Sequence, residues 1–141
     1  MVRVELEDIA VSADENQFLV LLRSEKGELL PIQIDALQAI AIAAGRSAEK
    51  TERPLTHDLL VSVLEMLGAT VARVEITDLI EGTFFSMLVL ERSGVQFDVD
   101  ARPSDALAVA ARTQAPIFVA EHVLEENSLR DEFGSSGGAE A

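Results

Sequence analysis

The chain has no cysteine, tryptophan or tyrosine, and it has few basic residues: 11 Lys and Arg against 25 Asp and Glu, for a net charge of −14. The absence of cysteine excludes disulfides, thiolate metal sites and cysteine nucleophiles. The shortage of Lys and Arg argues against a broad phosphate-binding surface, because nucleic-acid affinity comes largely from cations that neutralise phosphates. A polyanion would therefore have to meet a local basic patch or a bound cation.

Long hydrophobic runs are also missing, and the first seven residues lack the apolar centre of a signal peptide. We therefore expect a cytoplasmic protein that makes no membrane contact. What is present is aliphatic: 48% of residues are hydrophobic and only six are Phe, which predicts a core of Val, Leu, Ile and Ala. At 141 residues the chain suits one core, so we predict a single domain over residues 1–133 and a disordered tail over 134–141.

Hydrophobic periodicity predicts two meanders of three strands, each followed by a helix. Alternation at Val2, Val4 and Leu6 marks the first strand. Gly45 and Gly68 are predicted to end the first two helices, and the many Ala side chains of the first should let it approach a neighbour closely. The fold class is α+β, with an antiparallel-rich mixed sheet and at least three helices. The predicted strands lie near residues 2–11, 18–22, 29–34, 72–77, 83–90, 95–100 and 117–119, and the helices near 36–44, 56–67, 103–112 and part of 121–133.

The two meanders end in similar corners. Asp35 and Gln38 follow the first as Asp100 and Asp105 follow the second, with an Ala-rich helix after each. This similarity predicts a repeat of three strands and a helix in which Asp35 matches Asp100 and Gln38 matches Asp105. Chance similarity between Ala-rich helices is the alternative.

The second corner carries the densest group of polar residues in the chain. Asp98 and Asp100 share one face of their strand because side chains alternate across a strand. Together with Asp105 they form a candidate Mg²⁺ or Mn²⁺ site, since these ions take carboxylate and water ligands and would also activate an attacking water. The alternative is that the three acids make structural ion pairs with Arg53 and Arg102.

The second helix begins with a candidate catalytic pair, His57 and Asp58. In the functional interpretation His57 acts as a general base or as a hydrogen-bond donor that binds phosphate, oriented by Asp58 or Asp100. In the structural alternative Thr56 is the N-cap and Asp58 satisfies the helix terminus, with His57 exposed. The second histidine, His122, is expected to face solvent, and the spacing of the two supports no zinc site.

Four motifs resemble one known family: Arg53–Leu60, Thr83–Phe85, Asp100–Ala106 and Ala115–Val119. In this order they are similar to the bifunctional nuclease family, a domain of bacteria and plants named for RNase and DNase activity. The resemblance covers roughly residues 1–125. It implies a compact domain of sheet and helices, a nucleic-acid substrate and self-association.

One region departs from that family's pattern. Similar proteins carry Pro-Ile-Trp-Ile-Gly followed shortly by Glu, whereas here Pro31-Ile32 is followed by Gln33, Ile34, Asp35 and then Gln38. An aromatic residue and a carboxylate are missing, and Phe85 replaces a common Tyr. Asp35 is a candidate substitute acid.

We predict a metal-assisted phosphodiesterase that acts on RNA or DNA and self-associates as a dimer through its Ala-rich helices. The alternative is a non-enzymatic oligomeric binding domain, for example for a small anionic ligand. Arginine side chains in the predicted site would bind phosphate oxygens. The predicted catalytic residues are His57, Asp58, Asp100, Arg102 and Arg53; the substrate-binding residues are Arg53, Thr56, Arg102 and Ser104; and the metal ligands are Asp98, Asp100 and Asp105.

Overall fold

The computed structural model describes residues 1–14 and 17–130, so the predicted disordered tail, 134–141, lies outside the described residues. Within this part the chain forms one domain of four helices and one mixed sheet. The helices are α1 (Ala36–Arg46), α2 (Thr56–Met66), α3 (Pro103–Thr113) and α4 (Glu121–Asn127). The strands are β1 (Val2–Val11), β2 (Phe18–Ser24), β3 (Glu28–Ile34), β4 (Thr70–Ile80), β5 (Thr83–Arg92), β6 (Val95–Ala101), β7 (Ile117–Val119) and β8 (Leu129–Arg130).

The sheet joins two antiparallel meanders, as the sequence predicts. Strands β1, β2 and β3 form one meander, and β4, β5 and β6 form the other. Strand β7 lies between them, antiparallel to β1 and parallel to β4, which gives the order β6-β5-β4-β7-β1-β2-β3-β8. The short strand β7 therefore turns two meanders into one sheet.

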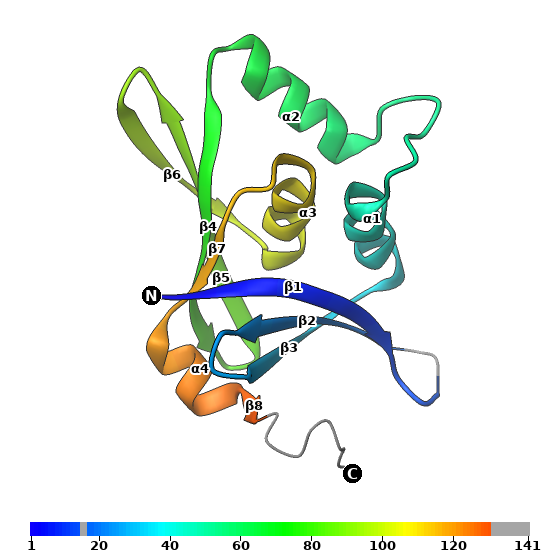
Figure 1. The fold of residues 1–141 in the computed structure, drawn as a ribbon, viewed down its shortest axis with the longest axis vertical. Coiled ribbons are helices and arrows are strands. Elements are labelled where there is room, and N and C mark those ends of the chain that lie inside the picture. The colour runs from blue at the N-terminus through cyan, green and yellow to red at the C-terminus, as the bar shows by residue number, and fades with distance from the viewer. Residues whose placement is uncertain (15–16, 131–141) are drawn as a thin grey trace.

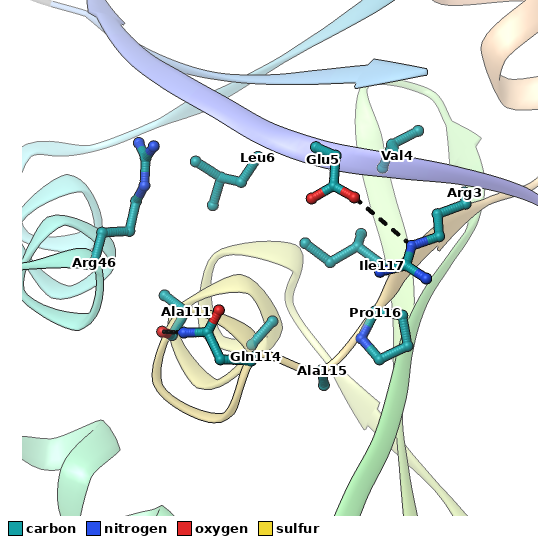
Figure 2. Close-up of a pocket in the computed structure, with 11 residues that line it drawn as sticks. Arg3, Val4, Glu5, Leu6, Arg46, Ala111, Gln114, Ala115, Pro116 and Ile117 are labelled. Carbon is teal, nitrogen blue, oxygen red and sulfur yellow. Dashed lines mark hydrogen bonds and ion pairs between the residues drawn. The ribbon is translucent and has the colours of Figure 1, made fainter. Parts of the chain in front are cut away.

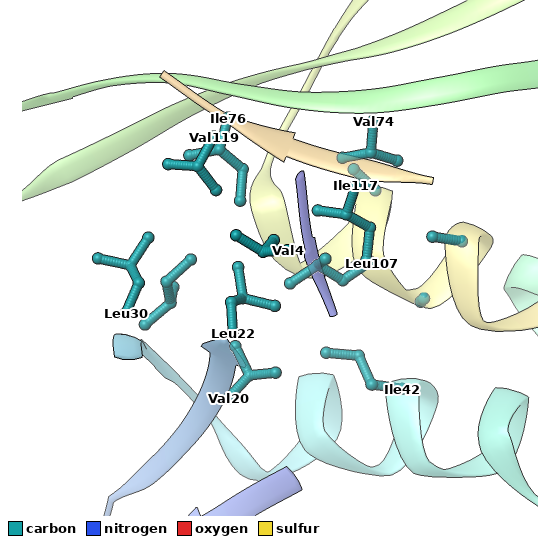
Figure 3. Packing of buried hydrophobic residues seen from close by; sticks show 14 of the residues in the cluster. Val4, Val20, Leu22, Leu30, Ile42, Val74, Ile76, Leu107, Ile117 and Val119 are labelled. Carbon is teal, nitrogen blue, oxygen red and sulfur yellow. The ribbon is translucent and has the colours of Figure 1, made fainter. Parts of the chain in front are cut away.

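Helices α1 and α3 lie side by side against the sheet, and α2 packs against α3 (Figure 1). The core between these helices and the strands is aliphatic, and Leu107 of α3 and Ile42 of α1 meet strand residues there (Figure 3). The Ala side chains of α3 are buried inside the chain, at positions 106, 108 and 110. The prediction of self-association through the Ala-rich helices is therefore wrong for α3, whose small face is used for packing within the chain.

Two predicted helix ends need correction. Gly45 does not end α1: the helix continues to Arg46, and Gly45 is not among the glycines with positive φ. Thr56 is not the N-cap of α2 but its first residue, because Leu55 holds the extended cap position. Gly68 follows α2 with a φ of 77°, so the predicted end of that helix is confirmed.

The two corners correspond in part. Gln38 and Asp105 are each the third residue of their helix, so the predicted match between them is confirmed in position. The match of Asp35 with Asp100 is wrong: Asp35 is the N-cap of α1, whereas the N-cap of α3 is Arg102 and Asp100 still belongs to β6. Two additional residues in the second corner, Ala101 and Arg102, separate Asp100 from the helix.

None of the helices in residues 1–14 and 17–130 is long and apolar enough to span a bilayer.

Candidate active site

A cleft of about 550 Å³ lies between α2, α3 and the β5–β6 hairpin. Its walls are mostly aliphatic because β5 and β6 pair Leu88 with Val99, which places these side chains on the same face as the helices. Polar side chains enter from the first turn of α2 and from the start of α3. The apolar walls are Leu60, Leu64, Leu88, Leu90, Val99 and Val109.

His57 and Asp105 form the central polar contact of this cleft. Nε2 of His57 lies 2.9 Å from Oδ1 of Asp105, and the two residues are 48 positions apart in the chain. The other oxygen of Asp105, Oδ2, accepts from Nε of Arg102 at 3.4 Å. The His57 side chain is 15% exposed, whereas Arg102 is 71% exposed. The cleft thus has a sheltered imidazole, a carboxylate beside it and a guanidinium that solvent reaches freely.

This arrangement fixes the role of each imidazole nitrogen. A carboxylate has no proton to give, so Nε2 must donate to Asp105, and in the neutral ring Nδ1 is then the basic nitrogen. A carboxylate that holds one ring nitrogen orients a histidine and stabilises the imidazolium that forms when it accepts a proton. The pair is therefore suited to general-base chemistry.

Asp58 does not orient His57, which corrects the sequence prediction. Its Oδ2 accepts from the backbone N–H of Leu55 at 2.8 Å, and its Oδ1 accepts from Nε of Arg112 at 2.6 Å. The Leu55 N–H, together with Arg112, lowers the pKa of Asp58. Asp58 lies in a separate cavity beside Arg112, so the residue that orients His57 is Asp105.

The predicted metal ligands are not gathered in one place. Asp98 and Asp100 share a face of β6, as predicted, but their cross-strand neighbours are Val89 and Met87, on the face opposite Val99. Asp105 is engaged with His57 and Arg102. Within the described residues, no three His, Cys, Asp or Glu side chains lie close enough to hold a metal ion. The predicted three-carboxylate site is therefore not assembled: Asp98 and Asp100 lie on the face of β6 opposite Val99, whereas Asp105 lies in the cleft that Val99 lines.

The remaining predicted residues divide between the cleft and other places. Thr56 lines the cleft, and Asp100 borders it at the end of β6 although its side chain lies on the face opposite Val99. Ser104 is buried, so its predicted contact with substrate is wrong for this structure. Arg53 lies exposed in the segment before α2, and its backbone oxygen accepts from the Thr51 hydroxyl. Arg53 is not among the described residues that line the cleft.

Two of the positions that depart from the family pattern, Asp35 and Gln38, form the N-terminal cap of α1. Asp35 Oδ1 accepts from the backbone N–H of Gln38 at 2.8 Å, and the Gln38 side chain accepts from the N–H of Asp35 at 2.9 Å. This reciprocal cap satisfies two free N–H groups of the helix. Asp35 is thus a capping residue, and Gln33 is exposed on β3.

A second cavity of about 300 Å³ lies between β1 and the last turn of α3, and Figure 2 shows its lining. Arg3 pairs there with Glu5 at 3.7 Å, and Arg46 donates to the backbone oxygen of Glu7 at 3.3 Å. No histidine lines this cavity. It lacks a proton-transfer pair, so the cleft around His57 is the better candidate active site.

Comparison with known proteins identifies the family. The sequence model of the bifunctional nuclease domain matches residues 20–132, most of the chain. The chain belongs to the bifunctional nuclease domain family. It is 41% identical over 130 residues to a Mycobacterium tuberculosis protein whose name says only that it is uncharacterized, covering 92% of this chain and 77% of that protein. It is 28% identical over 116 residues to bifunctional nuclease 1 of Oryza sativa subsp. indica and 27% identical over 116 residues to bifunctional nuclease 2 of Arabidopsis thaliana, in each case covering 79% of this chain and 35% of the relative.

Sequence reasoning missed two features of this bifunctional nuclease domain. The sequence does not predict the aliphatic walls of the cleft, because nothing in it shows that α2 stands away from the β5–β6 hairpin. The sequence pattern also does not single out Arg112, although this residue contacts α1 and α2. A hint was available: Arg112 follows Asp105 by seven residues, two helical turns, so both lie near one face of α3.

Proposed function

We propose that this domain cleaves phosphodiester bonds of RNA or DNA at the cleft around His57. The observation that carries the proposal is the contact of His57 with Asp105 beside an exposed Arg102. Family membership supports it, and the rice and Arabidopsis relatives are named bifunctional nucleases. The chain covers about a third of each of those plant proteins. The proposal therefore concerns only the domain that this chain shares with them.

In the proposed reaction His57 is the general base. Its Nδ1 takes the proton from the attacking oxygen, which belongs to water or, in RNA, to the 2′-hydroxyl. The new P–O bond forms as the bond to the leaving sugar oxygen breaks, and that oxygen takes a proton from solvent. Asp105 stabilises the imidazolium, and Arg102 binds the phosphate oxygens, whose negative charge a guanidinium matches well. General-base catalysis of this kind contributes about 100- to 10,000-fold in rate.

No step in this proposal passes through a metal ion, because the acids predicted to bind one are not gathered. Arg102 supplies the positive charge at the cleft instead. A single arginine contact implies a weak dependence on salt. With one neutralised phosphate on a single strand, the affinity should fall only about two- to threefold between 50 and 200 mM salt.

The test compares His57→Gln and Asp105→Asn with wild type on labelled single-stranded RNA and DNA, with EDTA, Mg²⁺ or Mn²⁺ present. His122→Gln is the matched control, because His122 contacts Asp78 far from the cleft and is 54% exposed. We expect His57→Gln to lose at least about 100-fold in kcat and the control to keep wild-type activity. Circular dichroism checks that each variant is folded.

Each outcome decides something. Cleavage that His57→Gln retains would show that the cleft is not the active site. Cleavage that EDTA abolishes would keep the nuclease activity and reject the route without metal. Absence of cleavage in every condition would reject the activity and favour the alternative of a binding domain, which the mostly apolar walls of the cleft also suit.

We further propose that two copies associate through a surface formed by α2 and β6. No residue of α2 is fully buried, and Met66 is 86% exposed. Apolar patches of this kind on soluble proteins commonly mark interfaces. The chain carries a charge of −14, but α2 has only two acidic residues, and one of them is neutralised by Arg112. Strand β6 adds the exposed Asp98 and Asp100, but alternation places them on the face opposite Val95 and Phe97. Repulsion between two copies is therefore weak on the apolar side of this surface, whose exposed apolar residues are Leu59, Val63, Met66, Leu67, Val95 and Phe97.

A further inference from the structure

Arg112, in the last turn of α3, is held by three helices at once. Its Nε donates to Oδ1 of Asp58 in α2 at 2.6 Å, and its Nη1 donates to the backbone oxygens of Ala41 in α1 at 2.9 Å and of Ala108 in α3 at 2.8 Å. The side chain is only 7% exposed. A charge this buried is tolerated only where its partners are fixed, because removing one leaves the other unpaired.

Gly45 of α1 provides the space for this side chain. A Cβ atom at position 45 would lie 2.7 Å from Nη1 of Arg112 and 2.9 Å from the Cβ of Ala111. Both distances are shorter than real Cβ contacts allow. Glycine is therefore required at position 45 because it has no side chain, and not because of its backbone conformation. The space it leaves lets the Arg112 side chain pass between α1 and α3 to reach Asp58.

The ion pair fixes the part of α2 that carries His57. His57 and Asp58 are neighbours in the first turn of α2, and their partners, Asp105 and Arg112, lie two turns apart on α3. Two turns correspond to about 10 Å along the helix axis. Two contacts separated in this way set both the rotation and the tilt of the first turn of α2. Because no residue of α2 is fully buried, hydrophobic packing contributes little to the position of this helix, and the two contacts can determine it.

We propose that Arg112 is a positioning residue: acting through Asp58, it holds α2 so that His57 meets Asp105, and Gly45 makes this possible. The proposal rests on the role given to His57 above. It predicts that loss of the Arg112–Asp58 contact frees the first turn of α2 and exposes His57 while the rest of the domain stays folded. It also predicts a loss of turnover without a matching loss of substrate affinity, because Arg112 does not line the cleft.

The test measures how fast each histidine reacts with diethyl pyrocarbonate, followed by peptide mass spectrometry. The chain has only two histidines, so His122 is an internal reference. From their exposures, 15% against 54%, His57 should react about three to four times more slowly than His122 in wild type. In Arg112→Met and in Asp58→Asn this ratio should approach one, and Arg112→Lys should give an intermediate value because it retains the charge. Asp58→Asn keeps an oxygen that can accept from Leu55, so it removes the ion pair and not the helix cap.

The variants are compared at a temperature where circular dichroism shows them folded. In the nuclease assay we expect Arg112→Met to lower kcat about 10- to 100-fold with little change in KM, since small displacements of a catalytic group have effects of this size. An unchanged modification ratio in folded Arg112→Met and Asp58→Asn would overturn the positioning role and leave the nuclease proposal intact. Absence of cleavage in wild type would overturn the nuclease proposal, while the modification ratio would still decide whether Arg112 holds His57 in place.

Discussion

Gly45→Ala gives the sharpest test of the packing between α1 and α3. A glycine inside an exposed helix normally costs about 1 kcal/mol relative to alanine, so the substitution would ordinarily stabilise the protein. Here the new Cβ would lie 2.7 Å from Nη1 of Arg112 and 2.9 Å from Cβ of Ala111. Overpacking of this kind costs about 1–3 kcal/mol, and a disturbed hydrogen bond of a charged group adds about 1.5–3 kcal/mol.

We therefore expect Gly45→Ala to lower the free energy of unfolding by about 1.5–5 kcal/mol after the gain in helix propensity of about 1 kcal/mol is subtracted. Urea unfolding followed by circular dichroism at 222 nm measures this difference, because the chain has no Trp or Tyr for intrinsic fluorescence. The same substitution in an Arg112→Met background is the control. The flexible Met side chain can move aside, so the cost there should be smaller.

A Gly45→Ala variant more stable than wild type would refute this account of the helix contact. An equal cost in the two backgrounds would show that Ala111, rather than Arg112, limits the approach of α1 to α3.

Three further predictions concern pH, the core and self-association. The pKa of Asp58 is lower in the folded chain than in the unfolded chain. Its contribution to stability should therefore be present above the ordinary Asp pKa of about 3.9 and disappear as the pH falls through the lowered value, so Asp58→Asn should reduce the loss of stability in acid. Leu107→Ala should cost about 2–5 kcal/mol, because Leu107 is fully buried between α3 and the sheet. Val63→Asp should shift a dimer to monomer in light scattering, whereas Leu37→Asp, at an exposed position of α1, should not.

Their checks are direct. Equal urea midpoints of wild type and Asp58→Asn at every pH between 3 and 7 would contradict a role for the ionised carboxylate, since Asp58→Asn should lose stability near neutral pH. A cost below 1 kcal/mol for Leu107→Ala would contradict its place in the core. A wild-type chain that is monomeric at all concentrations, or a Val63→Asp variant that still dimerises, would reject the proposed surface.

Most of the fold prediction rests on local features of the sequence, namely side-chain alternation and turn residues. The two meanders follow from alternation, as at Val2 and Val4, and the end of α2 follows from a glycine with positive φ at position 68. Gly45 was misread because a glycine near a helix end fits both a termination and a close helix contact. Only the neighbouring helix distinguishes the two.

The sequence predicts which residues belong to the site but not how they are arranged. His57, Asp58 and Asp105 were all chosen, but the sequence could not show which acid reaches the imidazole. Asp58, the neighbour in sequence, points to Arg112, and Asp105, 48 positions away, contacts the ring. Consecutive residues of a helix point about 100° apart, so the side chains of His57 and Asp58 point in different directions. Which distant residue each of them contacts depends on how α2 packs against α3.

The sequence by itself determined the strands, most helix positions, the family resemblance and the residues with chemical potential. It did so because these properties depend on alternation, turn residues and side-chain types that are local in the chain. The tertiary structure alone decided that α2 stands away from the sheet to leave an apolar cleft, and that Arg112 joins three helices. It also decided that Asp98 and Asp100 stay apart from Asp105. These outcomes depend on how α1, α2 and α3 pack, and packing is a property of contacts between distant segments.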